Sequence, residues 1–515
     1  MAVMVNGGGS SGGSTIRVIT EDSRLYGGTC MISCATGSVT ARMSSAGETT
    51  FRGVSFIGEV TVTVTNGSNV GTDTFIIPYY GMYEIEVADG DIYQINITTT
   101  ETTLYGKLIT ATYGQNTKTS VFSSDGEAVL KIFGYTGSVE LSSTDGSKTA
   151  TTTVEISSSS LTYNVSLLFV QIYGASWDGT SGTGWTRTDA SADFTDPVPY
   201  VSGASSYSSP FDNLYPWSGM VKSSRTGGVM VAIPKFWYKI TQSGAGIKIQ
   251  IADAETDGFS ASPLHMDRGD GKGERDVAYI GRYHCGSSDY KSVTGTKPKV
   301  SITRSAARTS IHNLGSTIWQ SDFSARFTIW LLYIVEFADW NSQAKIGYGC
   351  APTGSTSAVR NMGYTDSMPY HTGTDQSSRT TYGGTQYRNI EGLWDNCYDW
   401  MDGCYYASNG MNVILNPNSF SDSSGGVNIG TPTSGYPSAF AMKNVSGSFP
   451  CFIPSASSGS DSTFSCDSWG FYASRPCLYV GGNYGQGGSL GLFYVGNYSA
   501  TYADAYIGCR LLELP

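Results

Sequence analysis

The pattern of apolar and polar positions predicts β-strands in the first third of the chain. Residues 60–65 alternate valine with threonine, which is the period of a strand buried on one face. The run ends at Asn66-Gly67, a dipeptide that favours tight hairpin turns. Short strands joined by tight turns are therefore expected in this part of the chain.

The same pattern occurs twice, at an offset of 79 residues without a gap. Leu-Tyr-Gly at 25–27 recurs at 104–106, and Asn-Gly-Ser at 66–68 is matched by Asp-Gly-Ser at 145–147. A repeat of this length indicates one small domain used twice. We expect two all-β Ig-like sandwich modules, residues 21–99 and 100–170, that act as spacers.

The periodicity changes after about residue 170, where the repeat ends and Trp and Phe become frequent. Apolar residues at 327, 330, 331, 334, 335 and 338 follow helical spacing, which predicts an amphipathic helix over 324–340. The remainder is punctuated by glycine. We expect one large α+β domain over 171–515, with a lead-in subdomain at 171–300.

Composition narrows the class of protein. The chain has 515 residues, 64 Gly, 34 Tyr and a net charge of −11. No basic stripe is present, which disfavours nucleic-acid binding. The longest apolar stretch, 327–338, is too short to span a bilayer and contains Glu336, so no membrane insertion is expected. The ten cysteines contain no Cys-x-x-Cys pair, which favours free, buried thiols.

Residues 1–20 are predicted to be an N-terminal anchor segment. Its first 13 residues have neither a basic region nor a long apolar region, so no secretory signal is expected. Residues 6–14 have the Gly/Ser composition of a flexible linker. We predict that this segment anchors the chain to a partner.

The C-terminal tail has the composition of a recognition surface. Residues 483–506 are rich in Tyr, Asn, Ser, Asp and Gly. Tyr supplies rigid contact area, while Ser, Asn and Gly supply adaptable hydrogen bonding. The tail lacks the acid, base and nucleophile of a reaction centre.

Three motifs in order resemble the formylglycine-generating-enzyme type of C-type-lectin fold. Gly-Leu-Trp-Asp-Asn-Cys-Tyr-Asp-Trp at 392–400 resembles its Gly-Asn-Val-Trp-Glu-Trp signature. Tyr-Ile-Val-Glu-Phe-Ala at 333–338 is similar to its Glu-Trp-Glu-Tyr-Ala helix. Val-Gly-Gly-Asn at 480–483 and Ile-Gly-Cys-Arg-Leu at 507–511 resemble its closing strands. Together they cover about 320–515.

Within that fold, the pattern is similar to phage and bacterial variable proteins diversified by retroelements. The resemblance implies a bacteriophage virion fibre or receptor-binding protein with a C-terminal lectin-like domain. Its partners would be other virion proteins at the N-terminus and a host surface receptor, a glycan or protein, at the C-terminal domain. Homotrimerisation is expected from the resemblance to fibres. Gly481, Gly482, Gly508 and Arg510 would be scaffold.

We predict a ligand-binding surface built from residues of the tail. The binding energy of this surface should come from exposed tyrosines and asparagines. Alternate strand positions face inward, so some of these residues are expected in the core. The predicted contact residues are Tyr472, Tyr479, Asn483, Tyr484, Gln486, Phe493, Tyr494, Asn497, Tyr498, Tyr502, Asp504 and Tyr506.

Three alternatives compete with this prediction. The first is a purely structural head, collar or tail decoration protein. The second is an enzyme of the formylglycine-generating or glycan-cleaving kind. Cys451, Cys466, Cys477 and Cys509 match no catalytic pair and have no His/Cys ligand cluster beside them. The third is calcium-dependent sugar binding, for which the segment 416–418 (Asn-Pro-Asn) offers a neutral ligand where Ca²⁺ favours a carboxylate. We therefore expect a binding protein with no catalytic residues, no metal and no cofactor.

Overall fold

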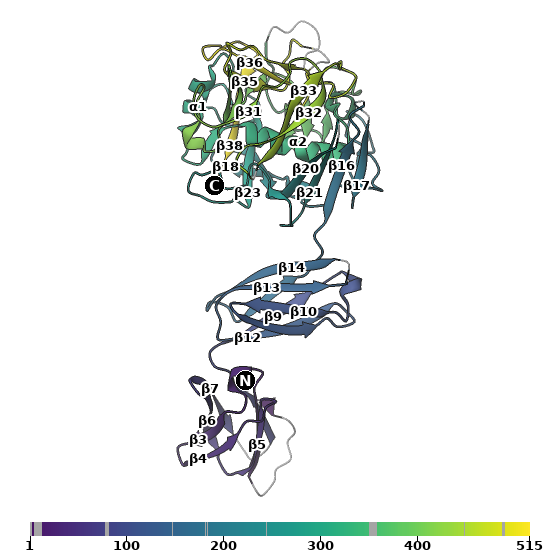
Figure 1. Ribbon diagram of the computed structural model, residues 1–515. Coiled ribbons are helices and arrows are strands. Elements are labelled where there is room, and N and C mark those ends of the chain that lie inside the picture. The colour runs from purple at the N-terminus through teal and green to yellow at the C-terminus, as the bar shows by residue number, and fades with distance from the viewer. Residues whose placement is uncertain are drawn as a thin grey trace. The chain divides into compact units, whose positions relative to one another are not determined.

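The computed structural model describes residues 3–4, 13–77, 82–146, 148–180, 182, 184–243, 245–349, 358–447, 449–486 and 490–515. The chain forms two compact units, 1–169 and 170–515. Strands dominate both units (Figure 1). No helix in the described ranges has the length and apolarity needed to cross a membrane. Residues 6–12 of the predicted linker at 6–14 lie outside the described residues.

Unit 1 contains two successive β-modules that share the same order of elements, apart from the additional strand β1 of the first. In the first module, one sheet has the order β1-β8-β2-β5 and the other β4-β3-β6-β7. Residues from both sheets meet in one core that includes Val18, Ile32, Val62 and Ile85. The bounds are β1 (Val3–Met4), β2 (Ser14–Ile19), β3 (Thr29–Cys34), β4 (Gly37–Arg42), β5 (Glu48–Val54), β6 (Gly58–Asn66), β7 (Asn69–Ile77) and β8 (Met82–Glu86), with the 3-10 turn η1 (Ser23–Leu25).

The second module repeats this plan with its own core, which includes Ile95, Ile109, Leu130 and Leu141. Its sheets have the orders β12-β9-β15 and β11-β10-β13-β14. The bounds are β9 (Ile92–Thr98), η2 (Thr102–Leu104), β10 (Leu108–Tyr113), β11 (Asn116–Val121), β12 (Glu127–Phe133), β13 (Gly137–Thr144), β14 (Thr149–Ile156) and β15 (Thr162–Ser166). Several strands, such as β3 and β10, begin 79 residues apart, the offset of the sequence repeat.

The module boundaries differ from the predicted 21–99 and 100–170. Strand β2 begins at Ser14 and pairs with β5 and β8, so it belongs to the first module and not to an anchor over 1–20. Strand β9 pairs with β12 and β15 and belongs to the second module. The physical reason is that the first strand of each module pairs with strands distant in sequence.

Unit 2 packs its sheets around one central helix, α2 (Phe323–Phe337), of which every residue is buried. Asp322 begins the helix by accepting a hydrogen bond from the Ala325 N–H. Ala338 ends it in the left-handed conformation, with φ 47°. The helix is therefore shorter than the predicted 324–340. It is enclosed on all sides rather than amphipathic.

Ten strands form two larger sheets of unit 2. The first has the order β17-β16-β21-β20-β22, and the second β18-β19-β23-β38-β24. The bounds are β16 (Ile172–Trp177), β17 (Trp185–Asp189), β18 (Lys222–Arg225), β19 (Gly228–Pro234), β20 (Trp237–Ser243), β21 (Gly246–Ala252), β22 (Ser260–Ala261), β23 (Val277–His284), β24 (Ile318–Gln320) and β38 (Arg510–Glu513).

Smaller sheets and helices complete unit 2. Their bounds are α1 (Arg304–His312), α3 (Ser342–Lys345), η3 (Trp217–Gly219), η4 (Pro417–Ser419), β25 (Gly373–Thr374), β26 (Thr385–Tyr387), β27 (Ile390–Glu391), β28 (Tyr398–Trp400), β29 (Cys404–Ala407), β30 (Gly410–Val413), β31 (Val427–Gly430), β32 (Pro437–Asn444), β33 (Pro450–Ser457), β34 (Trp469–Gly470), β35 (Cys477–Val480), β36 (Val495–Tyr498) and β37 (Ile507–Gly508).

The predicted lead-in subdomain, 171–300, shares its interior with the rest of unit 2. One core contains Tyr173 and Ile249 from this range together with Trp330, Phe493 and Leu512. Strand β23 also pairs with the C-terminal strand β38. Residues 171–300 are thus an integral part of one domain.

Candidate functional site

The C-terminal tail contributes to a five-stranded sheet with the order β34-β36-β35-β28-β37. One face of this sheet directs Leu478, Val480 and Val495 into the main core of unit 2. Successive strand residues point to opposite faces, so Tyr479 and Tyr498 lie on the other face. This outer face has its own small core, separate from the main one.

Six tyrosines gather on and beside this outer face and are called here the tyrosine cluster. The rings of Tyr479 and Tyr498 stack with centroids 4.6 Å apart and an interplanar angle of 8°. Tyr502 stacks on the opposite side of Tyr498 at 3.8 Å and 15°. Mutual stacking fixes the orientation of these rings and lowers the entropy they lose on binding. The members are Tyr398, Tyr479, Tyr494, Tyr498, Tyr502 and Tyr506.

Hydrogen bonds between hydroxyls connect the cluster further. The hydroxyls of Tyr479 and Tyr494 lie 3.2 Å apart, and those of Tyr502 and Tyr506 are also hydrogen-bonded. Tyr502 donates to Asp504 Oδ2 at 3.1 Å. Burial raises the pKa of Tyr502 to about 12. The phenol therefore stays protonated at neutral pH and remains a hydrogen-bond donor.

Tyr472 and Arg475 form the outer edge of the same region. Tyr472 is 60% exposed, the most exposed aromatic side chain in the described chain. The Arg475 guanidinium carbon lies 4.2 Å from the Tyr472 ring centroid and 5.7 Å from that of Tyr498. Asn497 fixes the turn between them, because its side chain accepts from the Tyr472 N–H at 3.0 Å and donates to the Tyr472 carbonyl at 2.9 Å.

Four of the twelve predicted contact residues are buried, which corrects their assignment. Tyr479, Asn483, Phe493 and Asn497 have exposures of 5%, 3%, 2% and 2%. Phe493 packs against Trp330, Tyr333 and Trp340 in the main core. Phe493 lies in the turn before β36 and is buried by these core rings, and Tyr479 is covered by the neighbouring tyrosine rings. The two asparagines are buried because their side chains hydrogen-bond to nearby backbone.

The other eight predicted residues retain surface. Tyr472 and Gln486 are exposed. The half-buried ones are Tyr484, Tyr494, Tyr498, Tyr502, Asp504 and Tyr506. Sequence reasoning missed Arg475 and Tyr398. Arg475 had a readable signal, since the last 127 residues contain only three cations, Lys443, Arg475 and Arg510.

Arg510 is a buried side chain that pairs with Asp399 on β28 of this sheet. It is 1% exposed, and its Nε donates to Asp399 Oδ2 at 2.8 Å. Its other nitrogens donate to backbone carbonyls of β23 and of residues 391 and 392. Burial would raise the pKa of Asp399, but the charges of Arg510 and His284 outweigh it and hold that pKa below its usual value. Arg510 is thus structural.

The motif at 392–400 is interior framework. All nine of its residues are buried. The Trp394 indole donates to the Gly347 carbonyl at 3.1 Å and the Trp400 indole to the Ile302 carbonyl at 2.9 Å. The Asp395 carboxylate accepts from the Thr385 backbone at 2.6 Å. These contacts hold segments that are distant in sequence.

Glu336 on α2 is a second buried anchor. It is 0% exposed and accepts hydrogen bonds from Arg388 at 2.5 Å, Ser209 at 2.8 Å and Tyr387 at 3.0 Å. Arg388 also lies 3.1 Å from Asp212. Glu336 therefore connects α2 to Ser209, Tyr387 and Arg388 as a structural anchor.

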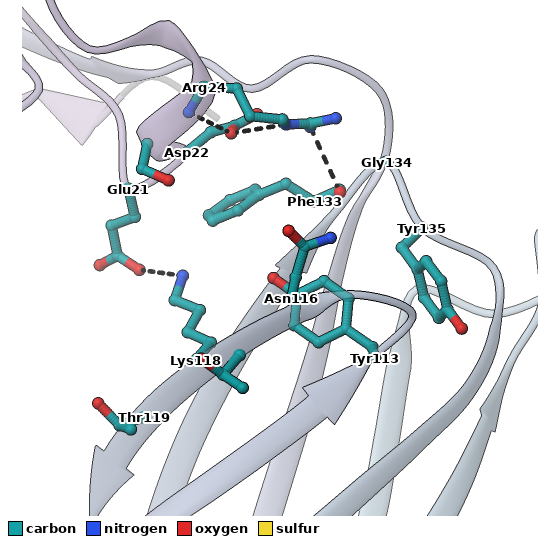
Figure 2. A pocket seen from close by; sticks show the side chains of 12 residues that line it. Glu21, Asp22, Arg24, Tyr113, Asn116, Lys118, Thr119, Phe133, Gly134 and Tyr135 are labelled. Carbon is teal, nitrogen blue, oxygen red and sulfur yellow. Dashed lines mark hydrogen bonds and ion pairs between the residues drawn. The ribbon is translucent and has the colours of Figure 1, made fainter.

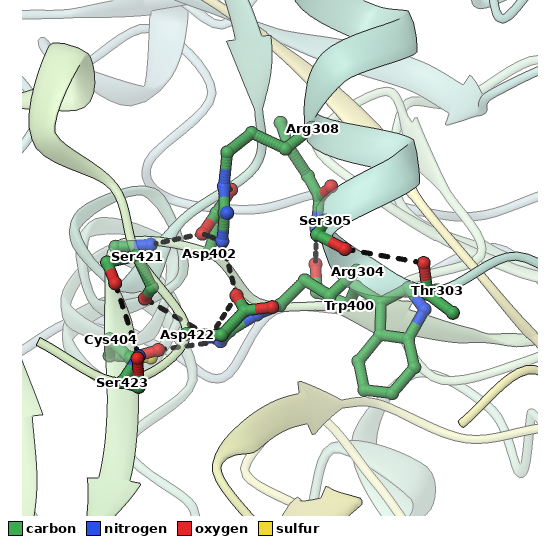
Figure 3. A network of polar contacts seen from close by, with 12 residues as sticks. Thr303, Arg304, Ser305, Arg308, Trp400, Asp402, Cys404, Ser421, Asp422 and Ser423 are labelled. Carbon is green, nitrogen blue, oxygen red and sulfur yellow. Dashed lines mark hydrogen bonds and ion pairs between the residues drawn. The ribbon is translucent and has the colours of Figure 1, made fainter. Parts of the chain in front are cut away.

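Two arginines of α1 form ion pairs with two aspartates, Asp402 and Asp422, which lie much later in the chain (Figure 3). Arg308 contacts Asp402 at 2.7 Å and Asp422 at 2.6 Å. Arg304 contacts Asp422 at 2.8 Å. Burial would raise the pKa of Asp422, but the two arginines outweigh it and lower that pKa. The network attaches the loop after η4 to α1.

The cysteines near the C-terminus show no catalytic arrangement. Cys451, Cys466, Cys477 and Cys509 are free and buried. Burial raises the pKa of Cys451 and Cys466 to about 12 and that of Cys477 to about 11. Such thiols are poor nucleophiles because the thiolate is the reactive form. Across the ranges that the structure describes, no three His, Cys, Asp or Glu side chains are placed to hold a metal ion.

A pocket of about 550 Å³ lies in unit 1 (Figure 2). Its charged side chains already contact one another or the backbone. Lys118 lies 3.5 Å from Glu21 and covers the Phe133 ring at 4.2 Å. Arg24 binds Asp22 at 2.7 Å and donates to the Phe133 carbonyl at 3.3 Å. These residues come from both β-modules, so the pocket is best explained as their joint.

No family model and no curated protein matches the chain. One similar solved structure is the Bacillus anthracis TIE protein, at 12% identity, 35% of this chain, 42% of that chain and a TM-score of 0.13. The matched region thus spans less than half of that protein.

Two further similar structures are a pilin and an adhesin. The shaft pilin spaA from Lactobacillus rhamnosus GG matches at 11% identity, over 30% of this chain and 97% of that chain, with a TM-score of 0.14. A putative adhesin from Bacteroides ovatus matches at 10% identity, over 32% and 98%, with a TM-score of 0.12. Scores this low carry no argument about fold or function.

Proposed function

We propose that the chain is a receptor-binding or fibre protein of a bacteriophage particle. The two β-modules of unit 1 are Ig-like spacers, and unit 2 is a lectin-like domain that binds a glycan or protein on the host surface. The N-terminal segment attaches to other virion proteins, and the assembled fibre is a homotrimer. The resemblance of the motifs at 333–338, 392–400 and 507–511 supports this proposal.

The observation that supports binding most directly is the tyrosine cluster with its exposed edge at Tyr472. Its rings are held by stacking before any ligand arrives, so little entropy is lost on contact. The carboxylates of Glu336 and Asp399 are buried and paired with arginines, and the four thiols near the C-terminus are buried. We therefore propose binding without catalysis.

The test is attachment of the purified full-length protein to host cells. Tyr472→Ala should weaken binding at least tenfold, because truncating an aromatic hot spot of an interface costs about 2 kcal/mol or more, about a thirtyfold change. The melting temperature should not change, since Tyr472 is 60% exposed.

Tyr382→Ala is the matched control, because Tyr382 is 39% exposed and lies outside the cluster. It should bind as the parent protein does. If the parent protein binds no host cell, or if Tyr472→Ala binds unchanged, the proposal fails. The alternative of a purely structural decoration protein would then be favoured.

A further inference from the structure

Arg475 stands out among the arginines of unit 2 by its lack of partners. Unit 2 has thirteen arginines. Ten of them form ion pairs with carboxylates, as Arg388 does with Glu336. Arg326 and Arg379 donate instead to backbone carbonyls. Within the described ranges, the Arg475 guanidinium has neither an ion pair nor a hydrogen bond, only the rings of Tyr472 and Tyr498.

Stacking on tyrosine leaves the hydrogen-bonding edge of a guanidinium free. A guanidinium that stacks on an aromatic face keeps its N–H groups in its own plane, where they stay available to a ligand. Such a fork matches the two oxygens of a carboxylate and binds them with two parallel hydrogen bonds. The side chain is half-buried, so part of its hydration is already lost before a ligand binds.

The turn that holds Arg475 is rigid. Asn497 binds the backbone of Tyr472 through both a donor and an acceptor, and its amide also donates to the Arg475 carbonyl. Arg475 N–H donates to the Tyr472 carbonyl at 3.0 Å. A cation on a turn fixed in this way, with Asp504 beside Tyr502 as a carboxylate on the same surface, is expected to select one anionic group by position.

We propose that the contact surface binds an acidic saccharide, with a sugar carboxylate on the Arg475 guanidinium and the sugar ring against Tyr472. This inference rests on the proposed binding function and specifies its ligand. The exposed ring of Tyr472 offers a flat apolar face of the size of a pyranose ring. The neighbouring hydroxyls of Tyr498 and Tyr502 are hydrogen-bonding groups suited to sugar hydroxyls.

The experiment uses immobilised oligosaccharides that contain uronic or sialic acids, each paired with its carboxyl-reduced neutral form. The full-length protein should bind the acidic member of at least one pair tenfold or more tightly than the neutral member. Raising NaCl from 50 to 500 mM should reduce this preference, because salt screens a surface charge contact. The probe panel also includes acidic peptides.

Three variants test whether Arg475 is the residue that binds the sugar carboxylate. Arg475→Gln should abolish the preference for the acidic member and its salt dependence. Arg475→Lys should retain only part of the preference, because a lysine cannot form the two parallel bonds. Lys222→Gln on β18, an exposed cation of the same unit, removes the same charge and should leave the preference intact.

Each outcome decides the inference. Equal binding of both members of every pair, or an unchanged preference in Arg475→Gln, overturns it. Binding to acidic peptides alone overturns the saccharide assignment. If host cells are bound but no saccharide is, the inference fails while the proposed attachment function stands. If host cells are not bound either, both fail.

Discussion

Gly496 lies directly against the ring of Tyr479: a Cβ atom at residue 496 would stand 2.5 Å from that ring. The two residues face each other across neighbouring strands, since Tyr479 pairs with Gly496 in the register of β35 and β36. Any side chain at 496 would push the Tyr479 ring away. Tyr479 in turn stacks on Tyr498, so the position of the cluster depends on this glycine.

We expect Gly496→Ala to lower the stability of unit 2 by about 1–3 kcal/mol, the usual cost of overpacking. Denaturant unfolding measures the loss. Gly470→Ala is the matched control, because Gly470 pairs with Gly496 in the sheet and its added Cβ would meet no atom within 4 Å. Equal stability of the two variants would contradict the close approach.

We expect Glu336→Gln to destabilise unit 2 by about 3–5 kcal/mol, because it leaves the buried Arg388 without its main counter-charge. Chemical denaturation followed by tryptophan fluorescence measures the effect. The control is Glu274→Gln, since Glu274 pairs with Lys235 but is 50% exposed. A surface pair contributes about 0–1 kcal/mol. A loss at 336 no larger than that at 274 would show that Glu336 is not an anchor.

Asp467 should make unit 2 less stable as the pH rises. Burial raises its pKa to about 7, against about 3.9 in an unfolded chain. Between about pH 4 and 7 the folded state holds a proton that the unfolded chain has released, so stability falls as the pH increases through this window.

Asp467→Asn should remove this pH dependence. Between about pH 4 and 7, its free energy of unfolding should fall by roughly 1–4 kcal/mol less than that of the parent. An amide oxygen can still accept the Phe493 N–H that Asp467 binds at 2.8 Å. Urea titrations at several pH values compare it with the parent and with Asp461→Asn, a change at an exposed position. Parallel curves for the parent and Asp467→Asn would refute the prediction.

Thiol labelling should distinguish Cys34 from the other described cysteines. Cys34 is the one described cysteine that is not buried, and a hydrogen bond from Thr36 lowers its pKa. We expect an alkylating reagent to modify Cys34 in the native protein, while the eight buried thiols react only after denaturation. Mass spectrometry of labelled peptides gives the sites. Fast native labelling of Cys451 or Cys477 would contradict their burial.

Local patterns predicted much of unit 1. The alternation at residues 60–65 corresponds to β6, and Asn66-Gly67 is the turn between β6 and β7. The register of the repeat also places η1 and η2 in equivalent positions. The module boundaries were wrong, because β9 is assigned only by its pairing with β12 and β15. Pairing between distant strands leaves no local trace in the sequence.

Unit 2 was less predictable for the same reason. The apolar spacing of α2 indicated a helix, but its polar residues pointed to an exposed face. Arg326 and Glu336 are buried because their partners, such as Leu492 and Arg388, come from elsewhere in the chain. Similarly, the tail composition indicated aromatic contact, while only the register of β35 and β36 shows which rings face outward.

The sheet β34-β36-β35-β28-β37 separates two apolar interiors by a single layer of backbone. Leu478 and Val480 belong to the interior that folds the domain, and Tyr498 and Tyr502 to the patch outside it. Replacing the half-buried rings of Tyr498 and Tyr502 therefore removes no side chain of the main core. Under the proposed binding function, such a partition would let new specificities arise by exchange of a few outer side chains, without the loss of fold that core substitutions bring.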